Sequence, residues 1–163
     1  VGTGNGRQGT SVSVSADGNT AIVGGPLDNN STGAAWIYNR IGGVWSQQYY
    51  KLVGTGATGS LIKQGTSVSI SADGNTAIVG GTGDNTNIGA AWVYTFSAAG
   101  GGAWTQQGAK LVGTHAIGTS FQGTSVSLSA DGNTAIVGGS ADHRHSAGAA
   151  GGNTRTAGAW KQR

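Results

Sequence analysis

The chain has 163 residues, 33 of them glycine, and a formal net charge of +3 at pH 7. It contains no cysteine, which excludes a disulfide framework, a zinc–cysteine site and a thiol nucleophile. No apolar run approaches the roughly 20 residues of a membrane span, so we expect no membrane-spanning segment. The first residues, Val-Gly-Thr-Gly, have no signal-peptide features, and we expect a mature chain or an excised piece.

The chain is built from three copies of one unit. The string QGTSVS(V/I/L)SADGNTAIVGG recurs with periods of 56 and 58 residues and varies only at one apolar position. A second string, GAAW(I/V)Y, follows the first two copies. A period near 56 fits a four-stranded propeller blade with its loops. The three copies of the longer string lie at residues 8–25, 64–81 and 122–139.

The first unit shows the expected strands in chain order. Val12 and Val14 alternate with serines, which is the two-residue period of a half-buried strand. Asp17-Gly18 then predicts a tight hairpin in which both turn residues have positive φ. The returning strand is rich in β-forming residues, and no segment carries a helical apolar period with caps. The second, third and fourth strands are predicted at 20–23, 34–38 and 44–53.

These patterns predict an all-β chain of three β-propeller blades, each with four antiparallel strands. The blades form part of a ring that a second copy or missing chain would complete. We expect the first blade, with an N-terminal closing strand, at 1–63, the second at 64–121 and an incomplete third at 122–163. Large aromatic residues such as Trp36 are expected where neighbouring blades pack face to face.

The third unit departs from the other two. Gly151-Gly152-Asn153 stands where the other copies have Trp-(Ile/Val)-Tyr, so two aromatic residues are lost. Two interpretations stay open: a degenerate blade, or an uncertain or incomplete sequence over residues 151–163.

The repeated strings resemble the FG-GAP repeat, the blade of integrin-α-like β-propellers that also occurs in bacterial surface and secreted proteins. The resemblance runs from Gln8 to about Trp160, although Gln-Gly replaces the family's Phe-Gly in all three copies. It implies an extracellular or cell-surface protein that binds protein or carbohydrate ligands. Some blades of such propellers hold calcium, and no other cofactor is expected.

Calcium candidates lie after the second strand of each unit. They are Asp28 with Asn30, Asp84 with Asn87, and Asp142. Each loop offers one carboxylate, whereas calcium takes six to eight oxygens and usually several carboxylates. The alternative is that these residues are turn formers that bond their own backbone.

The sequence offers little for catalysis. All six acids fall at two positions of the repeat, and an acid that recurs in every blade is expected to be structural. General acid–base catalysis needs two titratable groups in different environments, and no extra acid remains for such a pair. His143 and His145 form a local departure from the repeat that could hold a metal or be a solvated loop, and His115 is expected in a loop. We therefore predict no enzyme.

Nucleic-acid binding is not expected either, because the basic residues are scattered. The predicted function is a non-catalytic extracellular module for protein binding, adhesion or self-assembly through open blade edges. One alternative is a carbohydrate-binding propeller with Trp36 and Trp92 lining its pockets, and another is a structural filament subunit. A ring of two chains, a longer propeller chain and head-to-tail stacking all remain open.

Overall fold

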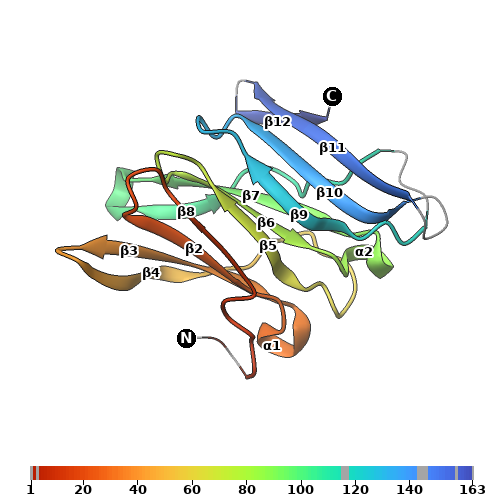
Figure 1. The fold of residues 1–163 in the computed structure, drawn as a ribbon, viewed down its shortest axis with the longest axis horizontal. Coiled ribbons are helices and arrows are strands. Elements are labelled where there is room, and N and C mark those ends of the chain that lie inside the picture. The colour runs from red at the N-terminus through yellow and green to blue at the C-terminus, as the bar shows by residue number, and fades with distance from the viewer. Residues whose placement is uncertain (1, 3, 115–117, 143–146, 157, 163) are drawn as a thin grey trace.

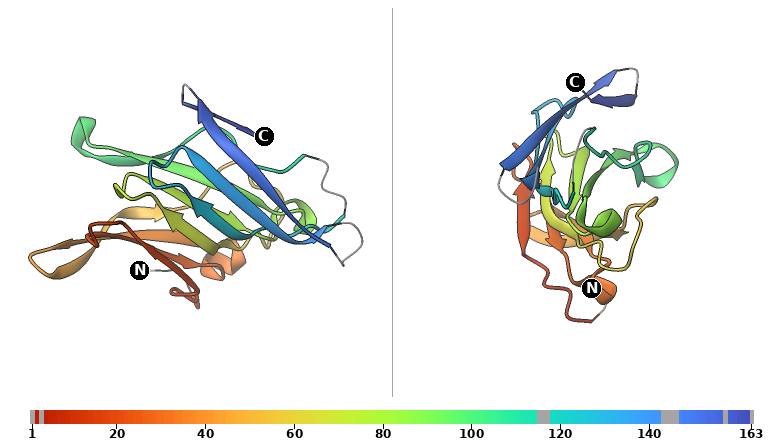
Figure 2. Two further views of the ribbon diagram at one scale, coloured as in Figure 1. Left: turned by 45° about the horizontal axis from the view of Figure 1, so that its top comes forward. Right: turned by 90° about the vertical axis from the view of Figure 1, so that its right-hand side faces the viewer.

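Three four-stranded antiparallel sheets make up the structure, a computed structural model that describes residues 2, 4–114, 118–142, 147–156 and 158–162. The chain is all-β, and the sheets do not form a closed barrel. We call the sheets blades 1, 2 and 3. They follow one another in chain order, with blade 2 between the other two (Figures 1 and 2). The predicted fold class is confirmed.

Each blade is a meander in which every strand pairs with its neighbours in sequence. Blade 1 contains β1 (Ser11–Val14), β2 (Thr20–Gly25), β3 (Ala34–Ile41) and β4 (Val44–Leu52). Blade 2 contains β5 (Gln64–Ile70), β6 (Thr76–Gly81), β7 (Ala90–Ser97) and β8 (Ala103–Gln106). Blade 3 contains β9 (Gln122–Leu128), β10 (Thr134–Asp142), β11 (Ala147–Thr156) and β12 (Ala159–Gln162).

Among the described residues, three single-turn helices lie between strands, and the sequence patterns did not predict them. They are α1 (Asp28–Ser31), α2 (Asp84–Asn87) and η1 (Ala99–Gly101). In α1 and α2 two central residues have left-handed backbone angles, for example φ 48° and ψ 63° at Asn29. Left-handed backbone angles are costly for most residues and cheapest for Gly, Asn and Asp, which accounts for Asn29, Asn30 and Asn85 but not for Thr86, the fourth of these residues.

The Asp-Gly hairpins form as predicted, but their turn differs. Of the two turn residues Asp17 and Gly18, only Gly18 has a positive φ. The Gly18 N–H donates to the Ser15 carbonyl at 3.0 Å. The Asp17 carboxylate accepts the Ser15 hydroxyl at 2.5 Å and the Asn19 N–H at 2.9 Å. These side-chain bonds select a longer turn in place of the two-residue turn with two positive φ values.

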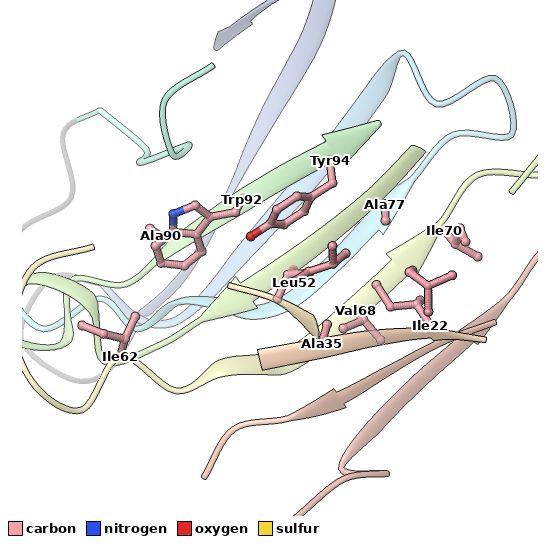
Figure 3. Close-up of a cluster of buried hydrophobic side chains, with 12 residues drawn as sticks. Ile22, Ala35, Leu52, Ile62, Val68, Ile70, Ala77, Ala90, Trp92 and Tyr94 are labelled. Carbon is pink, nitrogen blue, oxygen red and sulfur yellow. The ribbon is translucent and has the colours of Figure 1, made fainter. Parts of the chain in front are cut away.

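The core lies between blades rather than within one. One buried cluster joins blades 1 and 2 around Ile22, Val68, Ile70 and Trp92 (Figure 3). A second joins blades 2 and 3 around Ile78, with Val126 and Leu128 packed against it. Each blade therefore has a front face toward the preceding blade and a back face toward the following one.

The described residues before Ser11 form no strand. They run along blade 1, where the Leu27 N–H donates to the Gly6 carbonyl at 3.2 Å. The part that they take in closing a ring stays a prediction.

Candidate functional site

The junction between two blades occurs twice in this chain with the same bonds. The Ser11 hydroxyl donates to the Gly65 carbonyl at 2.9 Å, and the Ser67 hydroxyl donates to the Gly123 carbonyl at 2.7 Å. The serines of β1 and β5 thus lie on the back face of their blade and bond to the next one. The alternation of serine and apolar residues in the sequence sends one set to each face.

A second pair of bonds follows along the same strands. The Ser13 hydroxyl accepts the Ile70 N–H at 3.3 Å, and the Ser69 hydroxyl accepts the Leu128 N–H at 3.1 Å. The hairpin turns continue the series, because the Ala16 N–H donates to the Ala72 carbonyl and the Ala72 N–H donates to the Ala130 carbonyl. The two junctions are therefore equivalent in hydrogen bonding.

Glycine permits the close approach of backbones at each junction. Gly65 has φ +85°, and a Cβ on it would overlap the Ala34 carbonyl and the Gly25 nitrogen. Gly123 repeats this arrangement with φ +83°. A parallel bridge joins Gly33 to Gln64, and another joins Gly89 to Gln122.

The front face of blade 1 and the back face of blade 3 are not covered by another blade. Val12 is 67 % and Val14 is 55 % exposed, whereas their counterparts Val68 and Ile70 are buried against blade 1. On blade 3, Ile136 is 52 % exposed, although its counterparts Ile22 and Ile78 are fully buried. The two open faces are thus the two halves of a junction that the chain already forms twice.

The calcium candidates Asp28 and Asp84 are fully buried and form ion pairs. Lys51 Nζ lies 2.5 Å from Asp28 Oδ2, and Lys110 Nζ lies 2.5 Å from Asp84 Oδ2. The Thr58 N–H also donates to Asp84 Oδ1 at 2.7 Å. The ammonium groups supply the positive charge beside these carboxylates, so the geometry favours a structural ion pair over a calcium ligand.

The other calcium candidates do not join them. Asn30 is exposed, and Asn87 uses its backbone carbonyl to accept the Phe121 N–H at 2.9 Å. Asp142 ends β10 and pairs through its backbone with Ala147. The Asp142 side chain and the three histidines, His115, His143 and His145, lie outside the described residues. Among the described residues, no three His, Cys, Asp or Glu side chains gather as a metal site would require.

Trp36 and Trp92 are fully buried, but only Trp92 packs between two blades. Trp36 lies on the front face of blade 1, where a Cβ on Gly2 or Gly25 would contact its ring, so the expectation that it packs between blades is wrong for this chain. Trp92 Nε1 donates to the Thr55 carbonyl at 2.9 Å, and a Cβ on Gly54 or Gly81 would overlap its ring. Two glycines and one carbonyl therefore form a slot for the indole. Neither tryptophan offers the exposed ring that stacking on a sugar requires.

The hairpin carboxylates hold turns together. Hydrogen bonds from the Ser15 hydroxyl and then from Asn19 lower the pKa of Asp17, and the Ser129 hydroxyl and Asn133 do the same for Asp131. At Asp73 partial burial acts to raise the pKa, but bonds from Ser71 and Asn75 outweigh it and lower the pKa. These acids stay charged at neutral pH in a structural role.

The sequence analysis did not identify the lysines of the ion pairs, although the string KLVGT recurs at 51–55 and 110–114 and places a lysine at the same position of two units.

No described helix has the length and apolar character needed to cross a membrane.

Comparisons with family models and with curated proteins found no match. Among solved structures, the chain is similar to a hypothetical selenium-binding protein from Sulfolobus tokodaii, with 13 % identity and a TM-score of 0.53. The match covers 89 % of this chain and 37 % of that protein, so this chain spans little more than a third of that protein's length. At this identity the likeness shows the fold alone.

Proposed function

We propose that this chain is a non-catalytic extracellular β-propeller module that binds protein and assembles through its open blade faces. The FG-GAP resemblance of its repeats supports the extracellular setting and the protein-binding role. The observation that carries the proposal is the exposure of Val14 and Ile136 at positions that are buried or partly buried in the other blades.

The two open faces fit each other by the rules of the existing junctions. Ser125 and Ser127 are exposed on the back face of blade 3, at the positions of Ser67 and Ser69. Gly9, with φ +94°, stands on blade 1 where Gly65 and Gly123 receive a serine hydroxyl. A second copy of the chain would thus meet the first with bonds that the fold already makes. Apolar burial at Val12, Val14 and Ile136 would drive the contact.

The carbohydrate-binding alternative is not favoured, because Trp36 and Trp92 are buried. The filament alternative uses the same two faces and differs only in whether the ring closes.

The test measures the native mass of the 163-residue chain by light scattering and native mass spectrometry. A discrete particle of two chains is expected for a closed six-bladed ring, and a ladder of masses for a filament. Val14→Lys and Ile136→Lys should each reduce the particle to a single chain of 16.0 kDa. Ile41→Lys is the control, because Ile41 is 74 % exposed at the end of β3 and belongs to neither face.

Mixing the two face variants gives a further check. Each retains one intact face, so a mixture should form pairs of chains and nothing larger. A wild-type chain that stays single at every concentration tested would overturn the self-assembly proposal. Equal effects of all three lysine variants would also overturn it, because the faces would then have no special part.

A further inference from the structure

Blade 3 keeps the slot for an indole ring but lacks the tryptophan. The pairing of β10 with β11 places Gly151 opposite Val137, as Trp36 lies opposite Val23 and Trp92 opposite Val79. Glycine therefore replaces tryptophan at the same register position of the blade, and the strand is not shifted.

The walls of the slot are retained around this glycine. Gly113 and Gly139 stand where Gly54 and Gly81 contact the ring of Trp92. Gln122 bonds the backbone N–H of Gly113, as Gln64 bonds that of Gly54. The frame that holds an indole in blade 2 is thus present in blade 3.

The polar partner of the ring is also retained. Thr114 corresponds to Thr55, whose carbonyl accepts Trp92 Nε1. The Thr114 N–H donates to Gln162 Oε1 at 2.8 Å, as the Thr55 N–H donates to Gln106 Oε1 at 2.8 Å. Because the bond in blade 2 coexists with a bound ring, the bond in blade 3 need not break to admit one.

The slot is a cavity. It has a volume of about 70 Å³ before any side chain moves. Its lining is mixed, with Leu111, Gly113, Val137, Gly139 and Gly151 beside the polar residues Thr114, Ser120, Gln122, Asn153 and Gln162. A Cβ on Gly151 would meet nothing closer than Gln162 Nε2 at 3.6 Å. A cavity left by a missing side chain can bind a small aromatic molecule that replaces the lost contacts, and the polar groups of this lining favour a ring that also forms a hydrogen bond.

We propose that this cavity between blades 2 and 3 is a binding site for a small planar heteroaromatic compound of the indole type. The ring lies between Gly113 and Gly139, and its N–H donates to the Thr114 carbonyl. The site lies within one chain, so it does not depend on the proposed self-assembly.

Indole is the probe, and its binding to the intact chain is measured by calorimetry and by the rise in Tm with indole concentration. One indole per chain is expected. N-methylindole, which cannot donate a hydrogen bond, should bind several-fold more weakly because the Thr114 carbonyl loses its partner. Equal affinity for the two compounds would overturn the acceptor role of Thr114.

Gly151→Trp fills the slot from the chain itself. It should raise the Tm and abolish indole binding. If the Gly151→Trp chain does not fold, the smaller Gly151→Leu change takes its place and should weaken indole binding. Gly152→Val is the matched control. It adds a side chain to the same strand on the opposite face, where no atom lies within 4 Å of a Cβ, and should bind indole like the wild type.

Two results would overturn the site. One is the absence of indole binding to the folded wild-type chain. The other is wild-type binding by a folded Gly151→Trp or Gly151→Leu variant, which would place the indole elsewhere.

Discussion

Trp92→Ala tests whether the indole slots have rigid walls. The Trp92 side chain is fully buried, its ring lies against Gly54 and Gly81, and its Nε1 donates to the Thr55 carbonyl. Gly81 is held in the β6–β7 pairing, so the backbone on that side cannot easily move in to fill the space. Tryptophan-to-alanine changes in cores cost about 3–5 kcal/mol, and a slot that cannot collapse belongs at the upper end of that range.

The assay is urea unfolding at 25 °C, with Tm as a second readout. A loss of about 3–5 kcal/mol corresponds to a fall in Tm of roughly 6–20 °C for a chain of this size. Trp45→Ala is the control, because Trp45 is 44 % exposed and contacts Arg40 in a cation–π pair at 5.7 Å. Its loss should stay near 1 kcal/mol.

A loss below about 1.5 kcal/mol for Trp92→Ala would refute the reasoning, since it would mean that the slot collapses. The matching slot beside Gly151 would then have no reason to stay open. A larger gain in stability on adding indole for Trp92→Ala than for the wild-type chain would support rigid walls, because the excess would report a second preserved cavity that admits the ring.

Three further predictions concern the supporting structure. Lys110→Met should lower the free energy of unfolding by about 2–3 kcal/mol, less than for a fully buried pair because the Lys110 side chain is 19 % exposed. Adding Asp84→Asn should recover part of this loss, because it removes the unpaired buried charge. Urea unfolding of both variants checks this, and an unchanged free energy of unfolding in Lys110→Met would contradict it. Gly65→Ala should lower the stability by about 2–5 kcal/mol, because the new Cβ adds overlap with blade 1 to the cost of a positive φ. Gly56→Ala, with φ +76° and no atom near its Cβ, should lower it by only about 1–2 kcal/mol. Equal falls in Tm for the two variants would show that the close approach of backbones at Gly65 is unimportant. The hairpin acids Asp17, Asp73 and Asp131 have a lowered pKa in the folded state. Their contribution to stability is therefore present above their unfolded pKa of about 4 and is lost as the pH falls through the folded pKa. A variant with all three changed to Asn should lose less stability than the wild type between about pH 5 and 2, and urea midpoints that fall in parallel for the two proteins would refute this.

The sequence was most informative where one signal repeated. Alternating serine and valine in β1 predicted a strand with two different faces, and the structure shows what each face does. Serine hydroxyls bond the next blade, while Val68 and Ile70 pack against the preceding one. Period and composition were enough here because both depend only on neighbours in sequence.

Long-range pairs were not predictable in the same way. Asp28 looked like a cation ligand because the residues beside it are polar, and its true neighbour Lys51 lies 23 residues away on β4. The slot at Gly151 needed the strand register, since a missing tryptophan in a string of small residues does not reveal which walls remain. The left-handed turns of α1 and α2 were missed because asparagine-rich loops can adopt many conformations.

A repeated junction also limits how the open faces can be used. In both junctions the front face of one blade contacts a back face that carries serines at a fixed spacing. An unrelated partner would therefore have to supply two hydroxyl groups at that spacing and an apolar side chain like Ile136. A second copy of this chain supplies all three without further adaptation, because Ser125, Ser127 and Ile136 stand at the positions used in the internal junctions. Among protein partners, self-association therefore needs the fewest new contacts, and the lysine variants at Val14 and Ile136 test those contacts separately.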